Sequence, residues 1–336
     1  MQQRARSAEF AAVTRYLLPS MVFLTALGTG LWALPQLELR GPGYPGRFLI
    51  HEDAEPGENA FFVTRGAHEL SHLVLYHGIG SSIEHARDAD ILIIGNSRAQ
   101  LGFSEKVLVR EAAALGLRVF NLSVGHAESA EFARLLIARH DLRPRMVIAN
   151  GGDFFYGRRL SDWAREVVAM SRWQALKAYF EYCAGWELER RLHSRVPHLD
   201  YFQNWRYPWI HYRSRETGWW RNTREPESRY PIRAGEDAER YPHRLPVART
   251  LQRELAERGA LLVATIVPYR LVTTGHLPYF YRELGIPFAL PAFDGLETAD
   301  GSHLSPASAR RATRELWRDL LAYPEVRQQL SAATLR

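Results

Sequence analysis

The stretch Ile91-Leu92-Ile93-Ile94-Gly95-Asn96-Ser97-Arg98 decides the fold. Its four consecutive apolar residues are typical of a strand buried on both faces, and polar residues follow them at once. In open α/β sheets, ligands bind outside the carboxyl ends of the strands. The sequence therefore places Ser97 at the position where a parallel sheet carries its chemistry.

Short apolar runs alternate with helical patterns along the rest of the chain. Further strands are predicted at 117–122, 146–150 and 261–267, and helices at 83–87, 107–115, 127–140, 160–191, 247–258, 279–284 and 306–321. This alternation is the βαβ pattern of a parallel sheet. We therefore predict an α/β fold, a three-layer α/β/α sandwich with a mostly parallel sheet, over residues 83–325.

A second polar block, Asp300-Gly301-Ser302-His303, precedes Ser305-Pro306, which predicts the N-cap and first position of a last helix. A serine hydroxyl is a poor nucleophile until a base removes its proton, and His303 could be that base for Ser97. Asp300 could then hold the imidazole in the required tautomer. The candidate catalytic residues are Ser97, Asp300 and His303, and the alternative is an ordinary surface turn before a capped helix.

With these two blocks the chain resembles the SGNH or GDSL-like hydrolase superfamily, whose first block is Gly-Asp-Ser or Gly-Asn-Ser and whose last is Asp-x-x-His. The resemblance covers roughly residues 86–321. It implies an SGNH/flavodoxin-like fold and a serine esterase or acyltransferase that needs no cofactor. The family's second block matches 119–125 more loosely. Its third block, Gly-x-Asn, matches 147–153 except that Asp153 stands where the family has Asn.

The resemblance also implies hydrogen-bond donors for an oxyanion, namely the backbone N–H groups of Ser97 and Gly125 and a side chain of the third block. An ionised Asp153 only accepts hydrogen bonds, whereas Asn150 could donate but comes three residues earlier. Three alternatives stay open: Asp153 pairs with Arg98, Asn150 takes the donor position, or the oxyanion hole is weak.

Candidate substrate contacts are Arg98 and the pair Trp219-Trp220. Arg98 could bind an anionic group of the substrate or form a salt bridge at the start of a helix. Trp219 and Trp220 lie in 197–246, a segment rich in Trp, Tyr, Arg and Pro without regular periodicity, which we interpret as an insertion. Aromatic faces stack on sugars, so this segment could form a carbohydrate cleft; it could equally pack a loop-rich subdomain or dock on a membrane partner.

The segment His68-Glu69-Leu70-Ser71-His72 fits the pattern in which two helical histidines bind zinc. The chain has 13 histidines, so a chance match is plausible, and no convincing third ligand follows. We therefore predict no metal site and interpret the segment as a polar helix face before the first strand. Cys183 is the single cysteine, which excludes an intrachain disulfide.

Residues 16–35 carry no charge and are long enough to span a bilayer. Three arginines precede them against one glutamate, which by the positive-inside rule predicts a cytoplasmic tail over 1–15. Residues 36–82 would be a juxtamembrane spacer, and the catalytic domain would face the periplasm from the inner membrane. A cleaved signal peptide is the alternative.

Together these features predict a membrane-anchored serine acyl-transfer enzyme that works through a Ser97 acyl-enzyme, with an acyl donor and a cell-envelope or exported glycan as acceptor. Anchored proteins of polysaccharide O-acetylation and teichoic-acid D-alanylation look similar in plan, which implies a multi-spanning membrane O-acyltransferase as partner. The 43 Lys and Arg against 37 Asp and Glu form no long block of like charge, so we expect no nucleic-acid partner. The alternative is an inactive SGNH-fold scaffold or assembly subunit of a membrane complex.

Overall fold

The computed structural model describes residues 39–40, 59–62, 64–65, 68–125, 128–151, 153–155, 160–195, 211–222, 229–234, 245–272, 274 and 277–331. All of them belong to the unit Leu39–Arg336. The predicted tail and membrane anchor, residues 1–35, lie outside these ranges. Within the described ranges, no helix combines the length and the apolar character that crossing a bilayer requires.

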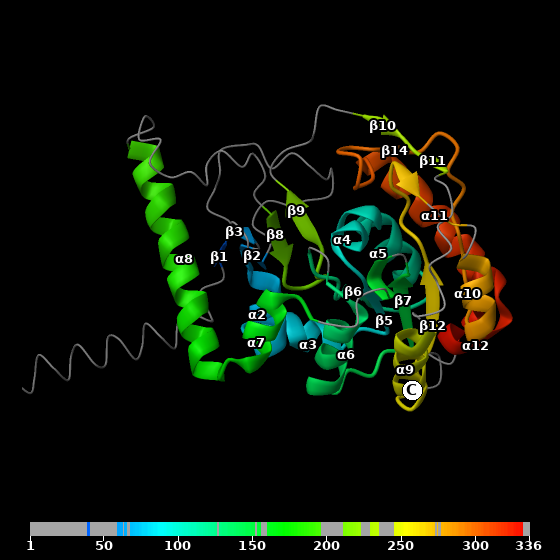
Figure 1. Ribbon diagram of the computed structural model, residues 1–336, viewed down its shortest axis with the longest axis horizontal. Coiled ribbons are helices and arrows are strands. Elements are labelled where there is room, and N and C mark those ends of the chain that lie inside the picture. Colours follow the sequence, from blue (N-terminus) through cyan, green and yellow to red (C-terminus); the bar gives the residue numbers. More distant parts are fainter. Residues whose placement is uncertain are drawn as a thin grey trace, which may run out of the picture. The chain divides into compact units, whose positions relative to one another are not determined.

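A four-stranded parallel sheet forms the centre of the unit (Figure 1). Its strands are β5 (Ile91–Ile94), β6 (Val119–Asn121), β7 (Met146–Asn150) and β12 (Leu261–Thr265), in the spatial order β12-β7-β5-β6. Phe288 continues the sheet beyond β12 through a parallel bridge to Ala264. The predicted α/β class and parallel sheet are confirmed, and the first strand along the chain lies between the second and the third.

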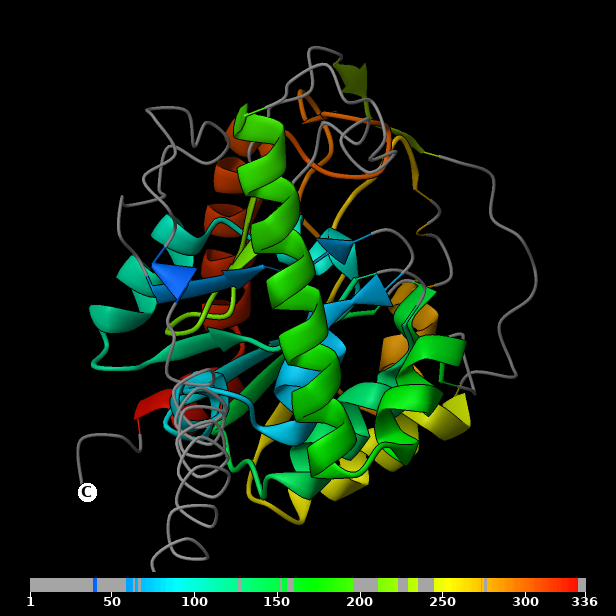
Figure 2. The ribbon, with the colours of Figure 1, turned by 90° about the vertical axis from the view of Figure 1, so that its left-hand side faces the viewer.

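Helices cover both faces of this sheet because its strands are apolar on both sides. Ile91 and Ile93 point into one core, and Leu92 and Ile94 point into the other. The first core is closed by α5 (Glu105–Ala113), α11 (Pro306–Ala322) and α12 (Pro324–Ser331). The second is closed by α2 (Leu70–His77), α3 (Ser82–Arg87), α6 (Ala130–Arg139), α7 (Asp162–Ala169), α8 (Arg172–Arg195), α9 (Leu245–Ala256) and α10 (Leu277–Leu284). Figure 2 shows α8 nearest to the viewer and α11 behind it, an arrangement compatible with the predicted three-layer sandwich.

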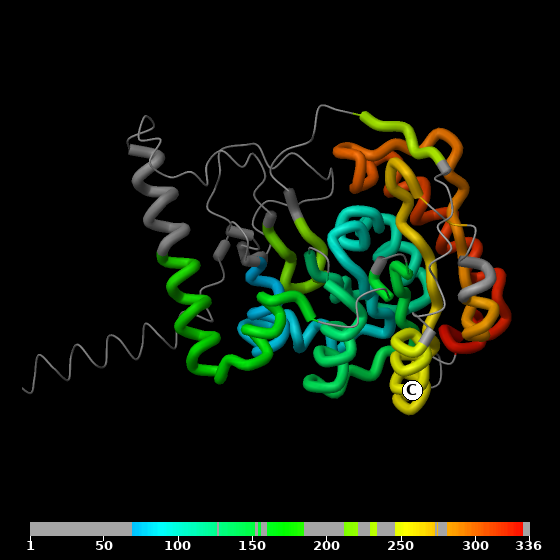
Figure 3. The backbone as a smooth tube through the Cα atoms, in the orientation of Figure 1, coloured from blue at the N-terminus to red at the C-terminus, as the bar shows by residue number. Residues whose placement is uncertain are grey.

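A second, antiparallel sheet has the order β1-β2-β8-β9, formed by β1 (Leu39–Arg40), β2 (Asn59–Phe62), β8 (His211–Ser214) and β9 (Trp220–Asn222). The hairpin β8–β9 lies against the outer edge of β6, where the Asn121 amide donates to the Thr217 carbonyl at 2.8 Å. Gly218 has a φ of 77°, and a Cβ there would come within 2.2 Å of the Asn121 oxygen, so only glycine fits. The hairpin within the predicted insertion therefore packs against the edge of the central sheet, and Figure 3 shows its backbone beside that sheet.

The remaining elements are short. They are β3 (Thr64–Arg65), β4 (His68–Glu69), α4 (Ser97–Gly102), a 3-10 helix (Asp153–Phe155), β10 (Tyr230–Pro231), β11 (Arg233–Ala234), β13 (Leu271–Val272) and β14 (Glu297–Thr298).

Three predicted boundaries need correction. All eight residues of α2 are buried, so this part of the predicted spacer belongs to the core and is no exposed polar face. The single helix predicted over 160–191 is two helices, because Met170 takes an extended conformation between α7 and α8. The fold also continues past residue 325, since Val326 and Leu330 of α12 are buried in the first core.

Candidate active site

The sheet order gives the carboxyl ends of β5 and β7 a special position. The chain leaves β5 toward β6 on one side and reaches β7 on the other, which makes this pair of strand ends the topological switch point. The register pairs Ile94 with Ala149, so Gly95 and Asn150 lie next to each other. A Cβ on Gly95 would lie 2.7 Å from the Ala99 Cβ and 3.0 Å from the Asn150 Cβ, and glycine permits this close packing.

Ser97 is the first residue of α4, directly after this turn. Asn96 is the N-cap, and its Oδ1 accepts the backbone N–H of Arg98 at 3.1 Å. The first amides of a helix have no partner within the helix. The Ser97 N–H, at the first position of α4, therefore has no acceptor within the helix, and its role as an oxyanion donor stays a prediction.

The structure brings the three predicted catalytic residues together across more than two hundred residues of sequence. The Ser97 Oγ lies 3.0 Å from His303 Nε2, and His303 Nδ1 lies 2.7 Å from Asp300 Oδ2. Asp300 and His303 lie on one loop, which is closed by the backbone N–H of Ala299 donating to the His303 carbonyl at 2.7 Å. Ser97 and His303 are half-buried, so the hydroxyl remains accessible.

Asp300 sets the tautomer of the imidazole. Burial opposes the ionised form of Asp300. The hydrogen bond and the charge of the His303 side chain outweigh burial, as do the hydrogen bonds from the backbone N–H groups of His303 and Ser302, and the pKa of Asp300 falls to about 2. An ionised carboxylate only accepts hydrogen bonds, so His303 Nδ1 carries the proton that it shares with Asp300. The lone pair of His303 Nε2 then faces the hydroxyl of Ser97.

Arg98 connects the two polar blocks. Its Nε donates to the Ser302 Oγ at 3.2 Å, and its guanidinium lies 4.0 Å from the centre of the Tyr269 ring. These contacts hold the loop of His303 against the start of α4. The side chain of Asp153 lies outside the described part of the chain, so the pairing of Arg98 with Asp153 stays a prediction.

The Gly125 N–H, the second predicted oxyanion donor, already has a hydrogen-bond partner. The amides of Leu122 and Val124 donate toward β5, to the carbonyls of Ile93 and Gly95. Successive backbone N–H groups point in opposite directions in an extended chain, so the one after Val124 points away from β5. This Gly125 N–H donates to the buried Glu69 Oε2 at 2.5 Å. A Cβ on Gly125 would lie 2.2 Å from that oxygen, so this approach requires glycine.

Asn150 ends β7 next to the turn that carries Ser97. Its Oδ1 accepts the Val267 amide at 2.9 Å, which directs Nδ2 toward Asn96 Oδ1 at 3.4 Å. The sequence places Asn150 three residues before the family position, but the strand end of β7 adjoins the turn of Ser97. The side chain of Asp153 lies outside the described part of the chain, so Asn150 is the third-block candidate whose contacts can be described.

The two tryptophans of the predicted substrate cleft are buried instead. Trp219 is 2% and Trp220 is 4% exposed, and the Trp219 Nε1 donates to the Phe103 carbonyl at 2.9 Å. Their rings pack in the core, so they present no open face to a sugar. Among the described residues of this segment, Tyr212, Trp219 and Trp220 therefore serve the packing of the hairpin.

Gln100 was not predicted from the sequence. It lies one turn after Ser97 on α4, is 1% exposed, and bonds to the hairpin and to the end of β6. Its partners lie 23, 118 and 120 positions away. No local signal could therefore have identified it.

The zinc-like motif is divided between two elements. His68 lies in β4 and the helix α2 starts at Leu70, so His68 and His72 do not share a helix face. His72 Nε2 instead lies 3.1 Å from Glu128 Oε2. Within the described ranges, no group of three His, Cys, Asp or Glu residues is arranged to hold a metal ion.

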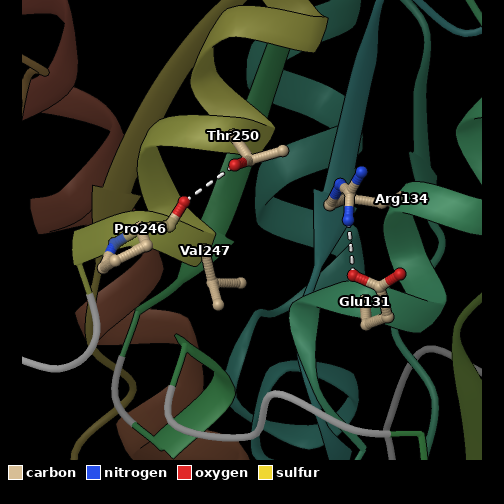
Figure 4. A pocket seen from close by; sticks show the side chains of 5 residues that line it. All are labelled: Glu131, Arg134, Pro246, Val247 and Thr250. Carbon is tan, nitrogen blue, oxygen red and sulfur yellow. Dashed lines mark hydrogen bonds and ion pairs between the residues drawn. The ribbon is translucent and has the colours of Figure 1, made fainter.

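A surface pocket of about 360 Å³ lies between α6 and α9 (Figure 4). Arg134 reaches into it, and its guanidinium is paired with Glu131 and Glu254. None of the lining residues belongs to the group around Ser97. We therefore assign the pocket no part in the candidate active site.

Comparisons of the chain with models of protein families, with curated proteins and with solved structures found no match in any of the three. The function of the chain has to be inferred from the residues around Ser97.

Proposed function

We propose that this chain is a serine acyl-transfer enzyme with an SGNH-like, flavodoxin-like fold. The observation that carries the proposal is the hydrogen-bonded line from Ser97 through His303 to Asp300, with separations of 3.0 and 2.7 Å. Both values lie within the reach that a nucleophile and its base require. The strand order, with the first strand between the second and third, supports the proposal because it places Ser97 at the switch point.

The reaction follows from these positions. The Ser97 oxygen attacks the carbonyl carbon of an ester while His303 Nε2 takes the hydroxyl proton. The ionised Asp300 stabilises the imidazolium that forms. Collapse of the tetrahedral intermediate expels the alcohol, which takes the proton from His303, and leaves the acyl group on Ser97.

Negative charge on the tetrahedral intermediate needs donors that are already oriented. The Ser97 N–H and the Asn150 amide group are the two candidates on the side of Ser97. In the second half of the reaction, His303 deprotonates either water or a sugar hydroxyl, which then accepts the acyl group. Hydrolysis and transfer therefore share one acyl-enzyme.

The uncharged segment 16–35 supports an anchored enzyme whose folded unit faces the periplasm. Tethering suits an enzyme that acts on a cell-envelope or exported glycan beside a multi-spanning membrane O-acyltransferase. The resemblance to the anchored SGNH proteins and the sequence of the amino-terminal segment support the anchoring, the glycan acceptor and the membrane partner.

The test is covalent labelling of the full-length protein in detergent with a fluorophosphonate probe, with turnover of p-nitrophenyl acetate in parallel. We expect labelling in the wild type, none in Ser97→Ala, and a strong loss in His303→Ala. Ser171→Ala is the matched control, because Ser171 is exposed at the start of α8. A folded wild-type protein that is neither labelled nor active would contradict the proposal.

A non-catalytic scaffold is the second candidate, and the engaged Gly125 amide favours it because one predicted oxyanion donor is occupied by Glu69. It predicts that Ser97→Ala restores function in cells that lack the protein. An enzyme predicts that only the wild type does so.

A further inference from the structure

Gln100 uses both ends of its side-chain amide in a buried site beside the nucleophile. Its Nε2 donates to the Ser123 carbonyl at 2.5 Å and to the Gly218 carbonyl at 3.2 Å. Its Oε1 accepts the backbone N–H of Trp220 at 3.0 Å. The side chain therefore connects α4 to the end of β6 and to the hairpin β8–β9 at once.

These bonds control where Ser97 lies, because α4 is only six residues long. A helix this short has little stability of its own and depends on tertiary contacts. At its far end, the Phe103 carbonyl accepts the Trp219 Nε1, so the hairpin contacts α4 at two places. His303 comes from a separate loop, and a shift of α4 would change the separation between Ser97 Oγ and His303 Nε2.

We propose that Gln100 is a positioning residue that fixes the nucleophile helix against the hairpin, an inference that rests on the proposed acyl-transfer function. Gln100 does not touch the reacting atoms. It acts by keeping the hydroxyl of Ser97 in the geometry that His303 requires. Displacement of a reacting group by about 1 Å can lower a rate about 10²-fold.

The test compares Gln100→Leu with the wild type in turnover of p-nitrophenyl acetate and in the rate of fluorophosphonate labelling. Leucine has a similar volume but removes the donor to the Ser123 and Gly218 carbonyls and the acceptor for the Trp220 N–H. We expect kcat and the labelling rate to fall about 10²-fold together while KM stays within about threefold. A role in folding alone would change the stability and leave the kcat of the folded fraction unchanged.

Gln252→Leu is the matched control. Gln252 Nε2 also donates to a distant backbone carbonyl, that of Leu284 at 2.9 Å, but it lies on α9. We expect Gln252→Leu to lose stability with an unchanged kcat. Trp219→Phe removes the indole N–H that donates to the Phe103 carbonyl, together with part of a buried ring, so it should lower kcat by a smaller factor through the same helix.

The outcomes separate the two proposals. If the wild type turns over the ester and folded Gln100→Leu has the same kcat, the positioning role is overturned and the proposed function stays intact. If Gln100→Leu does not fold, Gln100→Met decides, because the unbranched methionine matches glutamine in length and lacks its hydrogen bonds. An unchanged kcat in folded Gln100→Met overturns the positioning role. A folded wild type without labelling or turnover overturns the proposed function and this inference together.

Discussion

Asn150→Asp tests the assignment of the oxyanion donor most directly. The substitution keeps the shape of the side chain and keeps Oδ1 as the acceptor for the Val267 amide. It replaces the N–H₂ group that faces the turn of Ser97 with an oxygen. The side chain can then no longer donate to a negatively charged intermediate.

The expected magnitude follows from the two contacts of Asn150. Loss of one oxyanion donor lowers kcat by about 10² to 10³, or about 2.7–4 kcal/mol of transition-state stabilisation. The bond from Nδ2 to Asn96 Oδ1 is long at 3.4 Å, so its loss costs little. Asn150→Ala also removes the acceptor of the buried Val267 amide, which should cost a further ~1–3 kcal/mol of stability.

The assay is steady-state turnover of p-nitrophenyl acetate together with thermal unfolding of each variant. Asn121→Asp is the control, because Asn121 is also buried at a strand end and its Oδ1 also accepts a backbone amide, that of Ser123 at 3.1 Å. It also buries a carboxylate, and the group that it replaces donates to the Ala99 carbonyl of α4 at 3.4 Å and not to the Asn96 side chain. A folded Asn150→Asp protein whose kcat stays within threefold of the wild type would refute the reasoning.

Asp300→Asn should lower kcat about 10⁴-fold, because the imidazole loses its tautomer control; since the pKa of Asp300 is about 2, no loss of wild-type activity above pH 4 should trace to its titration. Burial lowers the pKa of His77 and His140 below 6.5, so the stability that depends on their neutral forms is present above pH 6.5 and is lost as the pH falls through their folded values. Urea midpoints at pH 7.5 and 5.5 should show this loss, and replacing both histidines with glutamine should reduce it. Burial raises the pKa of Cys183 to about 11, so the thiol should resist a thiol-disulfide reagent at pH 8 in the folded protein and react quickly in guanidinium. Fast reaction in the folded state would contradict the buried placement of Cys183.

The sheet and the three polar residues could be predicted because their signals are local. Ile91–Ile94 and Met146–Asn150 are apolar runs of strand length, and the predicted bounds of these two strands match the structure. Asp300 and His303 share one loop, so their spacing of three residues already allows the hydrogen bond between them. Ser305 caps α11 as expected, since its hydroxyl accepts the Ser308 amide.

The errors concern contacts between residues far apart in sequence. Composition does not distinguish an exposed tryptophan from one packed in a core, so Trp219 and Trp220 were misplaced. Arginine is rarely buried, yet Arg213 is 0% exposed. Its guanidinium donates hydrogen bonds to the carbonyls of Asn121 and Ser123, which satisfy it inside the protein.

The helix break was missed for a different reason. Neither glycine nor proline marks the junction between α7 and α8. Ser171 begins the next helix with a hydrogen bond to the side chain of Gln174 instead. Such a start signal is easily overlooked inside a continuous amphipathic pattern.

The position of β6 gives a physical reason why the mechanism proposed above takes its side-chain donor from β7. β6 ends the parallel sheet, and its outward backbone groups are buried by the hairpin, so each needs a partner. Thr217 accepts the Asn121 amide, and Glu69 accepts the Gly125 amide. These bonds engage the groups of β6 away from Ser97. β7 is paired with strands on both sides along its length, so at its end the Asn150 side chain faces the switch point. A donor from β7 can reach the intermediate without giving up a bond that the edge of the sheet needs.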